Sequence, residues 1–204
     1  MLHHQSATVI LFTLGTLVSC PVVASGQALF LDVGDPSPTR PGEINTMTLG
    51  ASFDRSADYA VAGIATSLVY NEVRGEFLFS NPRLIAPMAG PGTSAGVLAA
   101  SSIDDIIAGQ LNFPPAGIYA DPTNPIFFWA VDYTFEFDPA GGPAVLDLQT
   151  VTTRFDVYVS MDSATSESRL GDLREVDQQL VIFPTPASGS ALFLGIAMAT
   201  RRRR

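Results

Sequence analysis

Apolar and polar residues alternate with a period of two in several parts of the chain, as expected for β-strands with one buried face. The clearest example is residues 126–137. We expect its odd-numbered positions to point into a core; these are Phe127, Trp129, Val131, Tyr133, Phe135 and Phe137. The even-numbered face carries Asp132, Thr134 and Glu136, which we expect to face solvent.

A turn and a returning strand should follow this segment. Residues 138–143 combine Asp, Gly and Pro in a pattern typical of turns, so residues 144–160 are predicted to return as the antiparallel partner. The apolar positions change from even to odd numbers within the returning segment. This change predicts a bulge or a break near Gln149 and Thr150.

The remaining segments complete an all-β prediction. Further strands are expected at residues 28–33, 44–53, 59–70, 76–80, 111–113 and 179–183. About eight strands separated by turn signals favour a single antiparallel two-sheet sandwich, jelly-roll-like. Residues 103–110 are predicted to form a helix capped by Ser102, and residues 86–102 a loop rich in Ala, Gly, Pro and Ser.

The N-terminus has the pattern of an export signal. Residues 7–18 are apolar over twelve positions, which is the length of a signal-peptide core and too short to span a bilayer. Val22-Val23-Ala24 offers small residues for signal peptidase, so residues 1–24 are predicted to be a signal peptide. An alternative to cleavage by signal peptidase is a lipoprotein signal, in which the lipobox is Leu17-Val18-Ser19-Cys20 and Cys20 is acylated.

The C-terminus has the pattern of a sorting tail. It begins with Pro184, Thr185 and Pro186, continues with an uncharged apolar run over residues 187–200, and ends in Arg201, Arg202, Arg203 and Arg204. As a helix the run would be about 21 Å long, which is short for a hydrocarbon core of about 30 Å. The arginines favour the cytoplasmic side of a membrane, which leaves the preceding domain outside.

Residues 184–204 resemble the sorting signal of PEP-CTERM proteins, which combines a Pro-Glu-Pro-like motif, a short transmembrane stretch and a basic cluster. The resemblance implies processing by a membrane enzyme of the exosortase type, after export and cleavage by signal peptidase. Thr185 stands where the family usually has Glu. A plain C-terminal anchor that is never cleaved is the alternative.

The domain between the two signals, residues 25–183, is strongly acidic. It holds all 20 acidic residues of the chain and 7 of its 11 basic residues, because the other four form the C-terminal cluster, so its formal charge is −13. Such a field repels phosphate backbones and excludes nucleic acid as a partner. The domain also contains no His, Cys or Lys, which excludes Ser-His-Asp and thiol catalysis, Schiff-base chemistry, His/Cys zinc sites and disulfides.

Three kinds of chemistry are compatible with this composition. A glycoside hydrolase needs only two carboxylates, but Asp132 and Glu136 lie about 13 Å apart along one strand face unless a neighbouring strand supplies the second. A calcium site is the second possibility, and its candidate ligands are Asp32, Asp35, Asp54, Asp58, Asp104, Asp105 and Asp121. Glycan binding is the third, with Tyr59, Tyr70 and Tyr119 as candidate platforms, whereas Trp129 alternates in phase with the core.

A further resemblance concerns residues 59–71. The stretch from Tyr59-Ala-Val-Ala-Gly63-Ile64 to Tyr70-Asn71 resembles a strand of cohesin-type sandwich modules, which implies binding to a partner protein.

The sequence therefore predicts a non-enzymatic exported protein of the cell envelope or extracellular matrix, with no cofactor and with exopolysaccharide as a further candidate partner. The alternatives are a glycan- or calcium-binding module at the cell surface, and then a carboxylate-dependent glycoside hydrolase.

Overall fold

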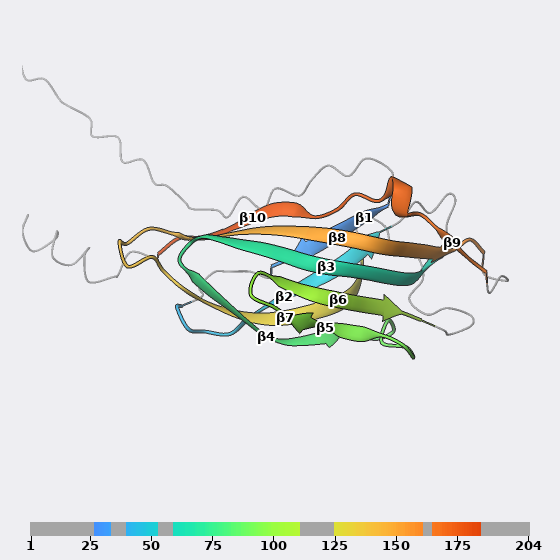
Figure 1. Ribbon diagram of the computed structural model, residues 1–204, viewed down its shortest axis with the longest axis horizontal. Helices are drawn as coiled ribbons and strands as arrows, with labels where there is room; N and C mark the ends of the chain where they lie inside the picture. Colours follow the sequence, from blue (N-terminus) through green and yellow to red (C-terminus); the bar gives the residue numbers. More distant parts are fainter. Residues whose placement is uncertain (1–26, 34–39, 53–58, 111–124, 161–164, 185–204) are drawn as a thin grey trace, which may run out of the picture.

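The computed structural model describes residues 27–33, 40–52, 59–110, 125–160 and 165–184. These residues form two antiparallel sheets packed face to face (Figure 1). The smaller sheet has the order β1-β2-β7-β4; the larger has the order β10-β8-β3-β6-β5, with β9 paired to β8. The predicted all-β, jelly-roll-like sandwich is therefore confirmed.

The strands of the smaller sheet are β1 (Ala28–Asp32), β2 (Asn45–Ser52), β4 (Glu76–Leu84) and β7 (Ile126–Glu136). Those of the larger sheet are β3 (Ala60–Arg74), β5 (Ser94–Leu98), β6 (Ser102–Gly109), β8 (Ala144–Tyr158), β9 (Ser166–Ser168) and β10 (Asp177–Ile182). The single turn η1 (Leu170–Asp172) is the one helical element among the residues described. The strand expected at residues 111–113 lies outside those residues.

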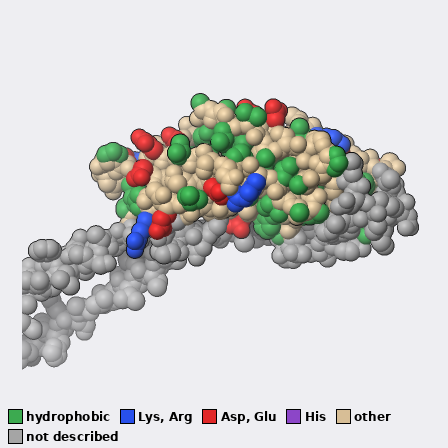
Figure 2. All heavy atoms as spheres, turned by 90° about the horizontal axis from the view of Figure 1, so that it is seen from below, with side chains coloured by type: hydrophobic (Ala, Val, Ile, Leu, Met, Phe, Trp, Pro, Cys, Tyr) green, Lys and Arg blue, Asp and Glu red, His purple; other side chains and the backbone are tan. Residues whose placement is uncertain are grey.

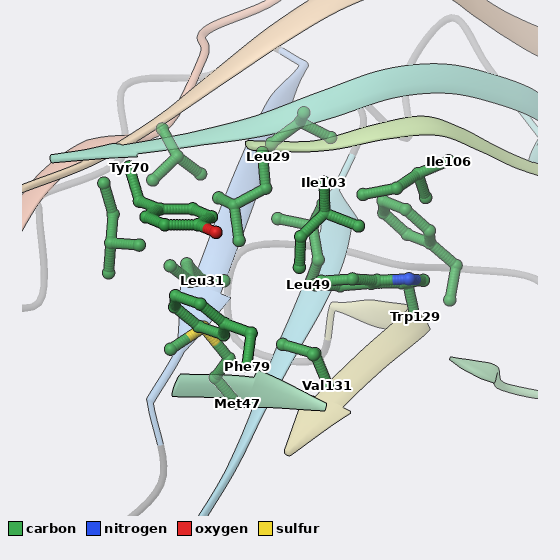
Figure 3. Packing of buried hydrophobic residues seen from close by; sticks show 14 of the residues in the cluster. Leu29, Leu31, Met47, Leu49, Tyr70, Phe79, Ile103, Ile106, Trp129 and Val131 are labelled. Atoms are coloured by element: carbon green, nitrogen blue, oxygen red, sulfur yellow. The ribbon is translucent and has the colours of Figure 1, made fainter. Parts of the chain in front are cut away.

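The core lies between the sheets and is built from alternating positions of both (Figure 3). Met47, Leu49 and Val131 enter it from the smaller sheet, and Ile103 and Ile106 from the larger. Every one of these side chains is fully buried. The inward face predicted for residues 126–137 is confirmed at its centre, where Trp129, Val131, Tyr133 and Phe135 are buried.

The prediction for Phe127 was wrong. Phe127 is only half-buried, whereas its neighbour Phe128 is fully buried. The register of β7 against β2 shifts between Leu49 and Gly50, which changes the alternation at this end of the strand. Gly50 gives the Phe127 ring the space it needs, since a Cβ added there would lie 2.9 Å from that ring.

The change of phase in β8 occurs later than predicted. Leu146, Leu148 and Thr150 point inward, and Phe155 and Val157 continue the buried face on odd numbers. Ala65 pairs with Arg154 and Thr66 with Thr152, so Thr153 is the extra residue rather than Gln149 or Thr150. The inward position of Thr150 is stabilised by hydrogen bonds, because its Oγ1 donates to Glu175 Oε2 at 2.6 Å and accepts from the amide of Val176 at 2.8 Å.

The helix predicted at residues 103–110 is wrong, because these residues form most of β6, between β3 and β5. Asp105 has a φ of +56° and the pairing with β3 shifts here, so Ile103 and Ile106 both face the core. A spacing of three residues between buried positions imitates a helical pattern. The loop predicted at residues 86–102 is also corrected, since it contains β5.

Both open sides of the sandwich are closed by contacts between the sheets. On one side the amide of Leu29 donates to the Arg174 carbonyl at 2.9 Å, and Gln178 Nε2 donates to the Leu31 carbonyl at 3.3 Å. On the other, the indole N–H of Trp129 donates to the Ala95 carbonyl on β5 at 2.8 Å. Among the described residues, the outer faces of the two sheets are therefore the broad surfaces that these contacts between the sheets do not use.

Candidate functional site: the outer faces of the two sheets

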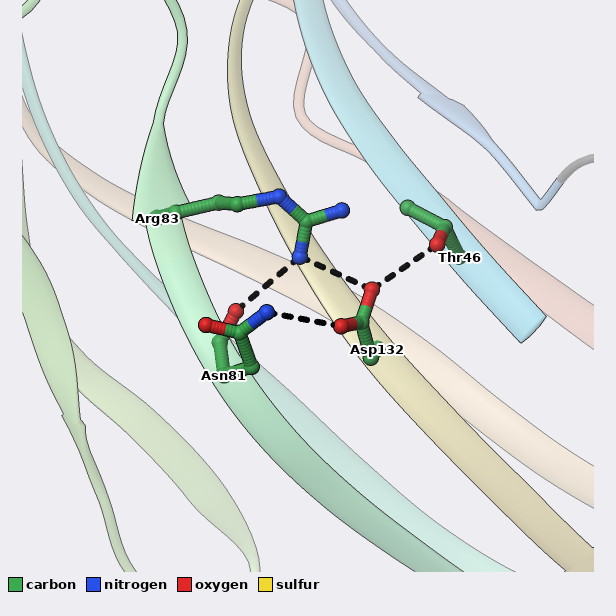
Figure 4. Close-up of polar contacts among 4 residues, drawn as sticks. All are labelled: Thr46, Asn81, Arg83 and Asp132. Carbon is green, nitrogen blue, oxygen red and sulfur yellow. Dashed lines mark hydrogen bonds and ion pairs between the residues drawn. The ribbon is translucent and has the colours of Figure 1, made fainter. Parts of the chain in front are cut away.

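The outer face of the smaller sheet carries a polar cluster centred on Asp132 of β7 (Figure 4). Its Oδ1 accepts hydrogen bonds from Thr46 Oγ1 on β2 and from the Arg83 guanidinium on β4, each at 2.8 Å. Its Oδ2 accepts from Asn81 Nδ2, also at 2.8 Å. The pairing of β4 shifts between Ser80 and Arg83, and Asn81 has a φ of +52°, so the bulge directs both β4 side chains to the carboxylate.

These contacts determine the protonation of Asp132. Partial burial alone would raise its pKa, but the hydrogen bonds from Asn81, Arg83 and Thr46, together with the Arg83 charge, outweigh it and lower the pKa below its ordinary value. Asp132 is therefore an ionised link between three strands. A general acid for glycoside hydrolysis requires the opposite shift.

We expect Asp132→Asn to lower the free energy of unfolding by about 1 kcal/mol at pH 7, because the exposed Arg83 partner limits the contribution of the ion pair. A pKa lowered by folding stabilises the protein above the unfolded-state value, about 3.9, and this stabilisation is lost as the pH falls through the folded-state value. The difference between the two proteins in urea unfolding should therefore shrink below about pH 4.

Asp105→Asn is the matched control, because Asp105 is exposed and Asn also tolerates a positive φ. It should change the free energy of unfolding by less than about 0.5 kcal/mol. A loss for Asp132→Asn that is equally large at pH 7 and pH 2.5 would contradict the role given to the ionised carboxylate.

Glu136 does not form a catalytic pair with Asp132. It lies opposite Glu76 of β4, and both glutamates are exposed at the end of an open sheet face. Strand β4 thus supplies a second carboxylate, that of Glu76, beside Glu136. Both of these glutamates are exposed to water, whereas the carboxylates of a glycosidase lie in a cleft that shields them.

The candidate glycan platforms within the described residues are largely occupied by packing. Tyr70 is buried, its ring centroid lies 4.6 Å from that of Phe79, and its hydroxyl donates to the Ala99 carbonyl at 2.9 Å. Tyr59 is half-buried and packs against the cluster of Ala60, Ala62 and Tyr158. Trp129 is fully buried, as predicted, and Tyr119 lies outside the described residues.

Among the candidate calcium ligands, Asp32, Asp104 and Asp105 lie in the part of the chain that is described, whereas Asp35, Asp54, Asp58 and Asp121 do not. Within the described part, no three Asp, Glu, His or Cys side chains are grouped closely enough to hold a metal ion.

The sorting motif lies almost wholly outside the described residues. Pro184 follows β10, whereas Thr185, Pro186, Arg201, Arg202, Arg203 and Arg204 fall beyond them, as do Cys20 and the rest of the predicted signal peptide. Among the residues that are described, none forms a helix with the length and apolar character needed to cross a bilayer.

The outer face of the larger sheet has a centre without charge, which sequence reasoning missed. We define the outer strip as Ala65, Ser67, Val69, Ile107 and Val151. Ala65 is the register partner of Ile107, and Ser67 that of Val151, so the strip crosses three adjacent strands. Val69 and Val151 are 37% and 53% exposed, which is a large exposure for apolar side chains at the middle of a sheet.

Carboxylates border the outer strip. Arg154, the register partner of Ala65 on β8, pairs with Asp156 at one end. Asp147 and Asp177 lie on the strands at the other end, and Asp104 and the exposed Asp105 lie opposite Ser67 on β6. On the face drawn in Figure 2, hydrophobic side chains lie in small groups among polar atoms. Alternation within residues 59–70 could have revealed the strip, because Ala65, Ser67 and Val69 form the uncharged outward set opposite Ile64, Thr66 and Leu68.

Comparison with solved structures identifies cohesins as similar folds. The seventh ScaB type I cohesin from Pseudobacteroides cellulosolvens matches with a TM-score of 0.53 and 11% identity, covering 81% of this chain and 97% of the cohesin. A cohesin module of a family 33 glycoside hydrolase from Clostridium perfringens matches with a TM-score of 0.40 and 14% identity, covering 78% and 98%. No protein-family model and no curated protein matches the chain.

Proposed function

We propose that this protein is a non-enzymatic, exported binding module that holds a partner protein on the outer face of its larger sheet. The observation that carries the proposal is the outer strip, an uncharged group with two exposed valines, Val69 and Val151, on the face of a strongly acidic domain. The similarity of its fold to a cohesin supports it, because the resemblance seen in residues 59–71 falls on β3, the strand at the centre of that face.

The partner's chemistry follows from the strip and its border. The small and β-branched side chains of the strip offer a flat apolar contact that buries well against another flat surface. The carboxylates of Asp104, Asp147 and Asp177 favour Arg or Lys around that contact and oppose an acidic partner. The proposed partner is therefore a protein with an apolar centre and a basic rim.

The site of action follows from the two ends of the chain. The apolar N-terminal segment and the PEP-CTERM-like tail from Pro184 to Arg204 support export followed by retention, or processing by an exosortase-type enzyme, at the cell surface. A binding module held in this way would attach its partner protein to the cell envelope or the extracellular matrix.

The experiment begins with a photo-crosslinking amino acid at Val151, which should link one discrete partner protein on intact cells. The purified partner is then titrated against the protein. Val151→Glu should weaken binding at least tenfold, or about 1.4 kcal/mol, because it places a buried charge at the centre of the contact. Raising the salt concentration should weaken binding as well.

Leu78→Glu is the matched control, since Leu78 is 71% exposed on the outer face of the smaller sheet. It should leave the affinity unchanged, and both variants should unfold at nearly the same urea concentration as the parent protein. Equal affinity for Val151→Glu and the parent would refute the proposal for this face.

A further inference from the structure

A second apolar area lies at the end of the sandwich from which the chain continues into its tail. We define the exit patch as Val73, Val145, Val181 and Phe183. Val181 and Val145 are register partners on β10 and β8, and Val73 is the extra residue where the pairing of β3 with β8 shifts between Glu72 and Arg74. Val73 is 53% exposed and Phe183 is 58% exposed, whereas the other two are half-buried.

The connections at this end place the patch beside the chain exit. β10 ends at Ile182, which pairs with Ala144, the first residue of β8. A Cβ on Gly75, between β3 and β4, would lie 3.1 Å from the Cβ of the same Ala144. The end of β10, the start of β8 and the corner from β3 to β4 are therefore neighbours, and they meet at the left of Figure 1.

The charged groups closest to the patch have partners within the protein. Arg74 Nε lies 3.8 Å from Asp138 Oδ2, and the Asp147 carboxylate accepts a hydrogen bond from Gln179 Nε2 at 2.7 Å. Asp138 is thus balanced by a cation, whereas Asp147 keeps its negative charge. The exposed ring of Phe183 itself favours an apolar or interfacial environment.

The length of the connection determines what can cover this patch. Only three residues, Pro184 to Pro186, separate Phe183 from the apolar run that begins at Ala187. Four residue steps span at most about 14 Å, whereas the headgroup region on one side of a bilayer is roughly 5–7 Å thick, so Phe183 lies within about 10 Å of the headgroup surface. When that run is inserted, Phe183 cannot lie far from the lipid headgroups.

We infer that the exit patch rests on the membrane surface, with Phe183 and Val73 in the interfacial region. The inference depends on the proposed insertion of the tail. The lipid it fits is zwitterionic, because the formal charge of −13 on residues 25–183 is repelled by anionic headgroups. Contact with the membrane at this end leaves the outer strip, farther along the same sheet, open to the partner protein.

The test uses the full chain with Cys20→Ser, reconstituted in phosphatidylcholine vesicles. A single cysteine is introduced by Val73→Cys or, as the matched control, by Val97→Cys on the edge strand β5, where the valine is 63% exposed. Each cysteine carries an environment-sensitive fluorophore. With nitroxide-headgroup lipid, we expect at least about a twofold loss of emission at position 73 and no change at position 97. Phe183→Ser should reduce the quenching at position 73.

Alkaline carbonate extraction of the same vesicles separates the two proposals. Protein that resists extraction while positions 73 and 97 are quenched equally would overturn the exit-patch inference and leave the inserted tail intact. Protein released by carbonate would overturn the inserted tail, and with it the inference. Greater quenching at position 73 in carbonate-resistant protein supports both.

Discussion

Trp129→Ala should reduce the free energy of unfolding by about 3–5 kcal/mol, which is a large part of the stability of a domain of this size. Trp129 is fully buried, so its removal leaves a large cavity between the sheets. The substitution also removes the indole N–H that donates to the Ala95 carbonyl at 2.8 Å and links β7 to β5. Urea unfolding followed by far-ultraviolet circular dichroism measures the loss.

A second substitution separates the two contributions of this side chain. Trp129→Phe retains an aromatic ring but loses the hydrogen bond to Ala95. The missing hydrogen bond should lower the free energy of unfolding by about 1–2 kcal/mol, in addition to the effect of the smaller ring. Phe127→Ala is the control for a large ring on the same strand, since Phe127 is half-buried on the outer side and should cost less than Trp129→Ala. A loss below about 1 kcal/mol for Trp129→Ala would contradict its role in the core.

The sequence was sufficient to predict the sandwich because simple alternation governs most of its strands. In β7 the alternation identified Trp129, Val131, Tyr133 and Phe135 as core residues, and all four are buried. The signal is strong there because large apolar side chains occupy one face without interruption.

Errors arose where a bulge alters the alternation. Asp105, with its positive φ, places Ile103 and Ile106 on one face of β6 and gives a strand the spacing of a helix. Thr153 is the extra residue that changes the phase of β8. The sequence placed this change too early, because Thr150 is buried although a polar threonine is not expected in a core. Bulges depend on the register between strands, which a single sequence does not specify.

The candidate site was harder to predict than the fold. The outer strip is defined by small uncharged residues such as Ala65 and Ser67, which carry no chemical signature. Alternation in residues 59–70 indicates the part of the strip on β3, but its neighbours Ile107 and Val151 are found only when β3, β6 and β8 are placed side by side. The Asp132 cluster likewise joins Thr46, Asn81 and Arg83, which come from two other strands far away in the sequence. Sequence reasoning correctly placed Asp132 on the outward face but could not identify its partners.

The corner at Gly75 provides the second large effect. Gly75 alone separates β3 of the larger sheet from β4 of the smaller sheet, so the chain changes sheets at this residue. Its φ is +79°, and an added Cβ would lie 2.5 Å from the carbonyl oxygen of Glu136, a backbone atom that cannot move without disturbing β7. Gly75→Ala should therefore cost about 3 kcal/mol, from the positive φ and from the displaced backbone together.

Gly141→Ala separates these two causes. Gly141 also has a positive φ, +84°, but an added Cβ would have no atom within 4 Å, so only the cost of the backbone conformation, about 1 kcal/mol, remains. Urea unfolding of the two variants should thus differ by about 2 kcal/mol, because close contact with the backbone of β7 is present only at Gly75. Equal losses in the two variants would show that the corner tolerates a Cβ and that the passage between the sheets is less tightly packed than this geometry requires.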